Sequence, residues 1–342
     1  MLRLPPFKYH RPDTVQDAVG LLAEFGDAAI PVSGGTDLIP NMKHRLFTPA
    51  HLVALKGVGE IKGIHAGDGE LVIGAAETLT DISLHPSVRL HFTALADAAG
   101  HVAGPQLRNS GTLGGNVCLD TRCTYYNQTH FWRQALGFCL KKDGDVCHVT
   151  KVGKKCVAAH SADTPPVLMT LRAQMDISGP GGDRTVPVMD FFVGDGIWNT
   201  RREPGEIVTR IRVPLAQSGA NGDSESGMGY ELRTAYVKLR QRQSIDFPLL
   251  TVAVAADVDS ENRLHSLRGV VTGLGARPKE LTGWDELGEG EVLTDELIDG
   301  LAERAFKQCR PLENMIVETE WRRAMVPVHV TRALRKLRRC DG

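Results

Sequence analysis

Two glycine-rich segments, roughly eighty residues apart, constrain this chain more than any other feature. The first, Pro31-Val32-Ser33-Gly34-Gly35-Thr36-Asp37-Leu38, directly follows an apolar run at 28–32 that is typical of a short strand. The second is Asn109-Ser110-Gly111-Thr112-Leu113-Gly114-Gly115-Asn116. Paired glycines let backbone N–H groups approach a ligand closely, and the neighbouring hydroxyls can add hydrogen bonds, which suits a pyrophosphate. Either loop alone is more typical of a plain tight turn.

The glycine loops also disfavour two common nucleotide sites. Neither loop fits G-x-G-x-x-G with an acidic residue about 20 positions on, the fingerprint of a Rossmann dinucleotide site. Neither fits G-x-x-x-x-G-K-[ST], the phosphate loop of nucleoside triphosphatases. A nicotinamide-dinucleotide enzyme of the Rossmann type and a nucleoside triphosphatase are therefore both disfavoured.

The cysteines are strongly clustered. Five of the seven fall within 39 residues, namely Cys118, Cys123, Cys139, Cys147 and Cys156. In a reducing compartment such a cluster is expected to bind metal rather than to form disulfides. Four thiolates are the usual ligands of a cubane iron–sulfur cluster, and no C-x2-C pair of a zinc ribbon or bacterial ferredoxin is present. Zinc stays open on ligand count, because His130, His148 and His160 lie nearby.

Charge and hydropathy exclude some partners. The chain of 342 residues has 40 basic and 41 acidic side chains, which gives no indication of nucleic acid or an anionic membrane. Its only strongly basic run, 332–339, is interpreted as a solvated helix face. The N-terminus lacks the apolar region of a secretory signal, and no stretch of about 18 apolar residues occurs. We therefore expect a cytoplasmic protein.

The remaining pattern predicts a mixed chain of two domains. Residues 1–225 form the first domain, with 120–160 inserted as an irregular loop, and residues 226–342 form the second. The Gly/Ser/Asn/Asp-rich stretch 218–229 is the linker candidate. Expected helices begin after Thr14 and cover 90–103, 295–309 and 318–337. Expected strands cover 28–32, 51–55, 71–74, 236–239, 249–258 and 267–273.

Together, the two loops and the motif Ser161-Ala162-Asp163-Thr164-Pro165-Pro166 resemble the FAD-binding medium subunits of molybdenum hydroxylases. The resemblance runs from about Phe7 to Leu337, and the second loop is its most specific element. It implies an α+β fold, with a two-part FAD-binding domain of the vanillyl-alcohol-oxidase-like (PCMH) type and a C-terminal α/β sandwich domain. It also implies partners: a molybdopterin-containing large subunit and a 2Fe–2S small subunit, in a dimer of heterotrimers.

The resemblance further implies roles for individual residues. The residues expected to wrap the FAD pyrophosphate are Pro31, Val32, Ser33, Gly34, Gly35, Thr36, Asp37 and Leu38 of the first loop and Ser110, Thr112, Gly114, Gly115 and Asn116 of the second. Asp163 is expected to bond ribityl or ribose hydroxyls, with a helix N-cap as the alternative. Val208 and Lys238 are expected beside the isoalloxazine ring. The alternatives are strand core for Val208 and a solvated strand lysine for Lys238.

The segment 120–160 departs from the common medium subunits, which lack it. This insertion is similar to that of one branch of the family, the flavin subunits of the 4-hydroxybenzoyl-CoA reductases, which carry an additional 4Fe–4S cluster. The resemblance implies Cys123, Cys139, Cys147 and Cys156 as cluster ligands. Cys118 is expected to be a small buried residue of the flavin domain and Cys309 a core residue, while Cys340 lies near the chain end. Aromatic residues that could enclose the cluster are Tyr125, Tyr126, Phe131, Trp132 and Phe138.

The expected function is electron transfer within a molybdenum enzyme complex. By resemblance, the complex removes the phenolic hydroxyl of 4-hydroxybenzoyl-CoA reductively, with electrons from ferredoxin, and the partner subunit performs the chemistry, so no catalytic residue is assigned here. Within the family, the alternative is an oxidising hydroxylase of another aromatic, purine or CO substrate. Outside it, the alternatives are a self-contained flavin oxidase and a zinc-stabilised binding module.

Overall fold

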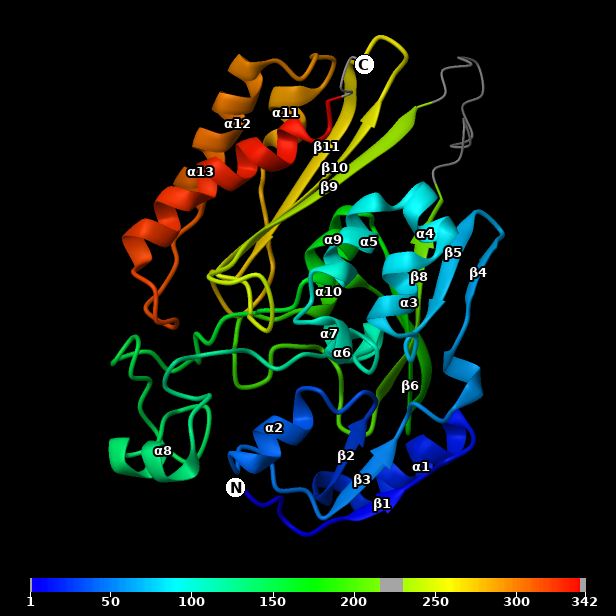
Figure 1. The fold of residues 1–342 in the computed structure, drawn as a ribbon, viewed down its shortest axis with the longest axis vertical. Helices are drawn as coiled ribbons and strands as arrows, with labels where there is room; N and C mark the ends of the chain where they lie inside the picture. The colour runs from blue at the N-terminus through cyan, green and yellow to red at the C-terminus, as the bar shows by residue number, and fades with distance from the viewer. Residues whose placement is uncertain (1, 216–229, 339–342) are drawn as a thin grey trace.

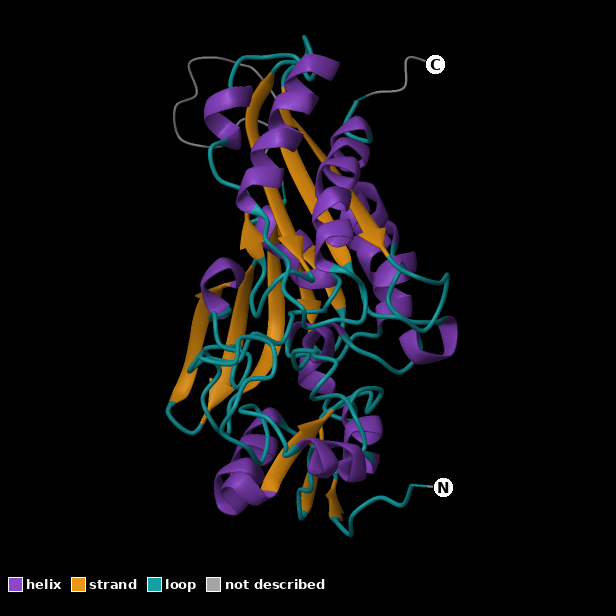
Figure 2. Ribbon diagram, turned by 90° about the vertical axis from the view of Figure 1, so that its left-hand side faces the viewer, coloured by secondary structure: helices purple, strands orange, loops and turns teal. Residues whose placement is uncertain are grey.

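The computed structural model describes residues 2–215 and 230–338, which form three parts stacked along the long axis of the molecule (Figure 1). Each part has its own sheet, and Figure 2 shows the three sheets one above another. Among the described residues, no helix combines the length and the apolar character needed to cross a membrane.

The N-terminal part is a small parallel sheet in the order β1-β3-β2. Its strands and helices are β1 (Lys8–His10), α1 (Val15–Phe25), η1 (Gly26–Ala28), β2 (Ala29–Val32), α2 (Leu38–Lys43) and β3 (His51–Ala54). Helix α1 begins as predicted, because the Thr14 hydroxyl accepts the Asp17 N–H and caps the first turn. Strand β2 ends at Val32, so the first glycine loop leaves the sheet at the carboxyl end of a strand.

The middle part is a five-stranded sheet in the order β4-β5-β8-β6-β7, with all neighbours antiparallel. Its strands are β4 (Ile64–Gly67), β5 (Glu70–Gly74), β6 (Gln174–Gly179), β7 (Gly182–Pro187) and β8 (Ile207–Pro214). The short helices of this part are η2 (Gly59–Ile61), α3 (Leu79–Leu84), α4 (Pro86–His91), α5 (Thr93–Gly100), α6 (Pro105–Arg108), α7 (Leu113–Val117), α9 (Thr164–Thr170) and α10 (Val188–Phe191). The second glycine loop is the segment that runs from α6 into α7.

The C-terminal part is a four-stranded antiparallel sheet in the order β12-β11-β10-β9. Its elements are β9 (Glu231–Leu239), β10 (Leu250–Val258), β11 (Leu264–Thr272), β12 (Lys279–Glu280), α11 (Trp284–Gly288), α12 (Asp295–Gln308) and α13 (Thr319–Arg335). Figure 1 shows α11, α12 and α13 on one face of this sheet. Helices α5 and α9 of the middle part pack on the sheet as well. Strand β10 is therefore covered on both faces, which explains its nearly continuous apolar sequence.

One predicted helix is divided in the structure. The segment 90–103 was expected to be continuous, but α4 ends at His91 and α5 begins at Thr93, with Phe92 in a non-helical conformation between them. The side chain of Phe92 is fully buried, so its core packing fixes the break. The predicted boundary at residue 225 and the linker 218–229 lie outside the described residues, and both stay predictions.

Candidate functional site

The two glycine loops lie directly against each other. A Cβ added at Gly34 would collide with the backbone carbonyl of Ser110, so only glycine allows the loops to approach this closely. The Thr112 hydroxyl donates a hydrogen bond of 3.1 Å to the Ser33 hydroxyl across the same junction. Two segments that are distant in sequence therefore form one surface of backbone amides and hydroxyls.

Two further glycines are required by the fold of the loops themselves. Gly35 has φ +68°, in the left-handed region that L-residues rarely adopt. A Cβ at Gly114 would lie 2.8 Å from the Cβ of Ala75, which follows strand β5. We had expected these glycines to admit a pyrophosphate by lacking a Cβ. The structure adds a second physical reason, backbone conformation at Gly35 and packing at Gly114, and the role toward a pyrophosphate stays a prediction.

The second loop continues into a short capped helix that ties it to α9. The Thr112 hydroxyl accepts the Gly115 N–H at 3.2 Å and caps α7. One turn later, the side-chain oxygen of Asn116 accepts the backbone N–H and the hydroxyl of Thr164, at 3.1 and 2.7 Å. Asn116 is buried, and its amide oxygen is directed at the start of α9. The structure therefore gives Asn116 a role in joining the loop to Asp163, the residue before Thr164.

Asp163 and Lys238, predicted for different parts of the flavin, form a buried ion pair. The Lys238 Nζ lies 3.0 Å from Asp163 Oδ1, and the Tyr236 hydroxyl donates to the same oxygen at 2.5 Å. Burial raises the pKa of Asp163, while Lys238 and Tyr236 act in the opposite direction. Asp163 stands at the N-cap position of α9, as the alternative has it, but its side chain makes no capping hydrogen bond. Lys238 is 1% exposed, which excludes the alternative of a solvated strand lysine.

The other residues predicted to bind FAD belong to elements of the N-terminal part and of the middle part. Pro31 and Val32 end β2, and Leu38 opens α2. The Thr36 hydroxyl would be only 3.4 Å from a Cβ at Gly111, so it also faces the second loop. Val208 is a buried core residue of β8, paired with Ile177.

Arg122 links the first glycine loop to the cysteine insertion. Its guanidinium forms an ion pair with Asp37 and lies over the Phe247 ring, 4.2 Å from the centroid. Its backbone exchanges two hydrogen bonds with Ala159, of 2.8 and 2.7 Å, which close the base of the insertion. Cys123 is the next residue, so one arginine connects the flavin loop with the first predicted cluster ligand.

The insertion is held to the rest of the protein at two other points. The Asn314 side chain donates to the Val157 carbonyl at 2.7 Å, and the Asn314 carbonyl accepts the Thr124 N–H at 2.9 Å. On the other side, buried Arg133 donates to the Arg45 carbonyl at 3.2 Å. The N-terminal and C-terminal parts both support the insertion, which is the peripheral segment containing α8 (His130–Leu136) in Figure 1.

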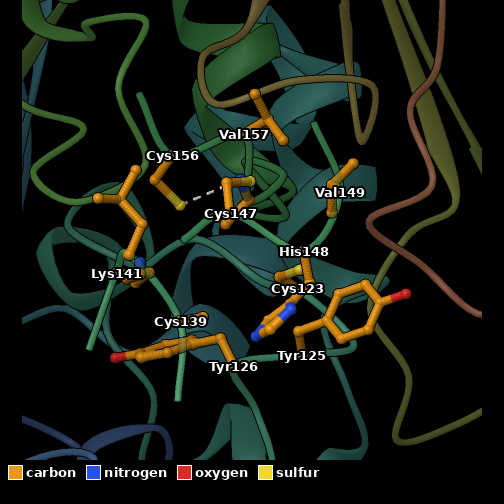
Figure 3. Close-up of a pocket in the computed structure, with 12 residues that line it drawn as sticks. Cys123, Tyr125, Tyr126, Cys139, Lys141, Cys147, His148, Val149, Cys156 and Val157 are labelled. Atoms are coloured by element: carbon orange, nitrogen blue, oxygen red, sulfur yellow. Dashed lines mark hydrogen bonds between the residues drawn. The ribbon is translucent and has the colours of Figure 1, made fainter. Parts of the chain in front are cut away.

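The four predicted cluster ligands line one cavity. Cys123, Cys139, Cys147 and Cys156 surround it together with Tyr125, Tyr126, Lys141 and His148 (Figure 3). The cavity contains about 290 Å³ of space free of protein atoms, part of it open to solvent. Cys118 is not among the lining residues and packs against the main core, as expected. Cys309 is fully buried in the C-terminal core, also as expected, and Cys340 lies outside the described residues.

A single zinc ion and a cubane cluster require different separations of their thiolate ligands. Four thiolates on one zinc ion at 2.3 Å would place their sulfurs about 3.8 Å apart. Within residues 2–215 and 230–338, no three His, Cys, Asp or Glu side chains are gathered closely enough to hold one ion. A cubane cluster requires wider separation, because each thiolate binds a different iron. A 4Fe–4S cluster at the four cysteines stays a prediction, with zinc as the alternative.

The cysteine sulfurs of the cavity differ in the number of hydrogen bonds that they accept. Burial raises the pKa of the Cys123 and Cys156 thiols to about 11 in each case. Burial acts in the same direction at Cys147, but the Thr150 hydroxyl and several backbone N–H groups donate to its sulfur and lower its pKa overall. Ala158 N–H donates to the Cys156 sulfur at 3.4 Å. Such N–H···S bonds stabilise thiolates, the form that binds iron.

The expected aromatic enclosure is only partly present. Tyr125 and Tyr126 line the cavity, and Phe138 packs near Arg133 and His130. The expectation was wrong for Phe131 and Trp132, which are 82% and 39% exposed on α8. Thr129 caps this helix, and its amphipathic spacing was too short to recognise within an irregular segment.

Three residues at the site were missed in the sequence. Lys141 lines the cavity, Arg122 joins it to the first glycine loop, and Asn314 anchors it from the C-terminal part. The sequence offers a signal only for Lys141 and Arg122, because both lie within two residues of a predicted cysteine ligand. Asn314 lies more than 150 residues from Val157, so no local pattern could have identified it.

Comparison with known proteins agrees with this geometry. Residues 5–216 match the family described as FAD binding domain in molybdopterin dehydrogenase, and residues 235–337 match the CO dehydrogenase flavoprotein C-terminal domain. The carbon monoxide dehydrogenase medium chain of Hydrogenophaga pseudoflava is 29% identical over 331 residues, covering 96% of each chain. The aldehyde oxidoreductase FAD-binding subunit of Escherichia coli K12 is 31% identical over 273 residues, 77% of this chain and 81% of that subunit.

A solved structure gives the same result. Carbon monoxide dehydrogenase from Hydrogenophaga pseudoflava, in a form that lacks the Mo-pyranopterin moiety, matches with a TM-score of 0.77 and 27% identity over 98% of both chains. The expected α+β fold, an FAD-binding domain followed by a C-terminal domain of this flavoprotein type, is therefore confirmed.

Proposed function

This chain belongs to the FAD-binding medium subunits of the molybdenum hydroxylase family, and from that premise we propose that it is an electron-transfer subunit with two redox groups, FAD and a 4Fe–4S cluster. The proposed complex reductively dehydroxylates 4-hydroxybenzoyl-CoA to benzoyl-CoA, and reduced ferredoxin is the electron donor. The proposed partners are a molybdopterin-containing large subunit and a 2Fe–2S small subunit, in a dimer of heterotrimers.

One observation carries the proposal. Cys123, Cys139, Cys147 and Cys156, separated by 15, 7 and 8 residues along the chain, line a single cavity. A flavoprotein that only passes electrons outward from substrate does not need a second one-electron port in this subunit. A low-potential donor that delivers single electrons does benefit from one, and a cavity lined by four cysteines and two tyrosine rings suits that role.

We propose that different residues of the chain bind different parts of FAD. The first loop, 31–38, and the residues Ser110, Thr112, Gly114, Gly115 and Asn116 hold the FAD pyrophosphate. Asp163 and Lys238 lie on the flavin side, where the ammonium can favour negative charge on a reduced ring, and Val208 supports the ring from the core. When bound, FAD exchanges electrons singly or in pairs, whereas the cluster exchanges them singly.

A second candidate function is favoured by the relatives. Their names assign them to carbon monoxide and aldehyde oxidation, in which electrons leave the substrate. Under this alternative the chain is the FAD subunit of an oxidising molybdenum hydroxylase for another substrate. The cysteine cavity would then hold a structural group or none.

The full chain, purified without its partners under exclusion of oxygen, tests the proposal. We expect FAD together with about four iron and four sulfide per chain, and an EPR signal that develops on reduction. A chain with FAD but without iron, or with zinc in place of iron, would contradict the proposed function and leave the oxidising alternative. For the substrate, the complete complex with reduced ferredoxin and 4-hydroxybenzoyl-CoA should form benzoyl-CoA, measured by chromatography.

A further inference from the structure

Lys141 is the one lysine or arginine that lines the cysteine cavity within the described part of the chain, and His148 is the other basic side chain there. Lys141 stands two residues after Cys139, and its side chain is only 4% exposed. Figure 3 shows it beside the cysteines and close to Tyr126, and its Nζ lies 4.5 Å from the centre of that ring. A buried lysine is costly unless its ammonium is fully hydrogen bonded, so its partners need to be identified.

Three oxygen atoms hold the ammonium. Lys141 Nζ donates to Asp120 Oδ1 at 2.6 Å, to the Thr121 hydroxyl at 2.5 Å and to the Gly196 carbonyl at 2.6 Å. An ammonium has three protons to donate, so these contacts satisfy it. The partners come from the base of the insertion and from the loop after α10, and the charge is therefore fixed in position.

The carboxylate that balances this charge lies farther from the cavity. Asp120 is not among the residues that line it, and its other oxygen accepts the Tyr126 hydroxyl at 2.9 Å. Asp120 Oδ1 also accepts the Thr121 N–H. The ammonium of Lys141 therefore lies at the cavity wall, and the carboxylate of Asp120 lies farther from the cysteines.

We propose that the Lys141–Asp120 pair sets the reduction potential of the group held by the four cysteines, with Lys141 stabilising its reduced form. This inference rests on the proposed function, because it requires a cluster in the cavity. Reduction adds one negative charge to a cluster already surrounded by four thiolates. A fixed ammonium at the wall of a cavity that is only partly open to solvent lowers the free energy of that added charge, and Asp120 raises it from a greater distance.

Two substitutions with opposite expected signs test the proposal in the full chain. Lys141→Met removes the positive end and leaves Asp120 unbalanced, so the midpoint potential should become more negative. Asp120→Asn keeps one oxygen acceptor for Lys141, places its amide N–H2 against the Tyr126 hydroxyl oxygen and removes the negative end, so the potential should become more positive. We expect each substitution to change the equilibrium constant of one-electron reduction about tenfold, which corresponds to a shift of about 59 mV in the midpoint potential. Lys142→Met is the matched control, because Lys142 is the next residue, does not line the cavity and faces Asp143 at 3.5 Å.

The measurement is an EPR-monitored redox titration, with iron and FAD content determined on the same samples. Opposite shifts in the two variants, without a shift in Lys142→Met, would support the inference. Iron-loaded variants that do not shift, or that shift in the same direction, would overturn it while leaving the proposed function intact. If Lys141→Met fails to retain iron, Asp120→Asn alone decides, since it keeps an oxygen acceptor for Lys141. A wild-type chain without iron would overturn the proposed function itself, and this inference with it.

Discussion

The glycine loops and the cysteine insertion lie next to each other but are built in different ways. At the loops, backbone packs on backbone: Gly34 meets Ser110, and Gly114 meets Ala75. The insertion is held to the neighbouring parts by side chains. Its apolar cluster is small, with Leu46, Tyr126 and Cys139 as the buried members. The first region packs directly on the core of the protein. The second has little core of its own, so we expect the bound cluster to supply much of its stability.

The largest effect should come from breaking the backbone contact in the first region. A Cβ at Gly34 collides with the carbonyl of Ser110, and neither backbone can move without disturbing β2 or α6. We expect Gly34→Ala to lower the free energy of unfolding by about 3 kcal/mol and to abolish FAD retention. Thermal unfolding and flavin content measure both effects. Gly20→Ala in α1 is the control, because no atom lies within 4 Å of its Cβ, and it should stabilise by about 1 kcal/mol.

A Gly34→Ala chain with normal stability and full FAD content would show that the two loops do not depend on each other. The glycine loops would then tolerate a substitution at their contact, and the proposed difference between them and the insertion would not hold.

The second effect is confined to the insertion. Cys139→Ser or Cys147→Ser should lower iron to well below four per chain, because a serine hydroxyl is a poor replacement for a thiolate. FAD should be retained, since both glycine loops lie outside the insertion. Iron and flavin analysis of the purified full chain provides the measurement. Cys118→Ser is the control and should keep its iron, because Cys118 does not line the cavity.

The ligand assignment would be wrong if Cys118→Ser removed the iron while Cys123→Ser retained it. Loss of FAD together with iron in Cys147→Ser would mean that the two regions form one cooperative unit.

The same contrast explains what the sequence could predict. Strand β2, the cap at Thr14 and the helices α12 and α13 follow from local patterns that agree with the final packing. The break at Phe92 could not be predicted, because only tertiary burial of that ring decides it. The glycines were recognised correctly as special, but their reason, contact with Ser110 or Ala75, exists only in three dimensions.

For the insertion, the cysteines were visible and their surroundings were not. Residue type is sufficient to nominate a thiolate ligand, and spacing excluded a zinc ribbon. The direction of an aromatic side chain depends on which face a short helix turns to solvent, which is why Phe131 and Trp132 were misassigned. Lys141 resembled the other lysines of the segment, and only its three oxygen partners distinguish it.

The third effect concerns the residue where the insertion rejoins the main chain. His160 is buried against Phe192, and neither ring nitrogen has a hydrogen-bond partner. Burial lowers the pKa of His160 to about 3 from its usual 6.5. The folded protein therefore binds fewer protons than the unfolded chain between pH 6.5 and 3. The stabilisation from keeping this ring neutral is complete above pH 6.5 and is lost as the pH falls through that window.

At pH 5 the expected loss is about 2 kcal/mol relative to pH 8, from about 1.5 pKa units at 1.36 kcal/mol each. His160→Phe should remove this part of the pH dependence, measured by denaturant unfolding at both values. Exposed His65→Gln is the control and should behave as wild type. Equal pH dependence in wild type and His160→Phe would mean that the ring is not buried in its neutral form.

The smallest effect should come from loosening the anchor that the C-terminal part provides. Asn314 has two bonds to the insertion, and Asn314→Ala removes only its side-chain bond to the Val157 carbonyl, while the backbone bond to Thr124 remains. The substitution also removes a longer contact of 3.4 Å that the Asn314 side-chain oxygen accepts from Arg322 within the C-terminal part. One hydrogen bond is worth about 1 kcal/mol, so global unfolding should change little. The local opening of the insertion should change more, because Val157 follows Cys156 and its N–H donates to the Cys147 sulfur. We expect iron to be released to a chelator about fivefold faster, the rate equivalent of about 1 kcal/mol, with FAD unaffected. Thr282→Ala is the matched control, because it removes a single side-chain hydrogen bond of 3.3 Å to Gln308 at the exposed edge of the C-terminal part. An unchanged release rate in Asn314→Ala would show that the cluster holds the insertion without this anchor, and the contrast between a preformed flavin region and a ligand-dependent insertion would become sharper.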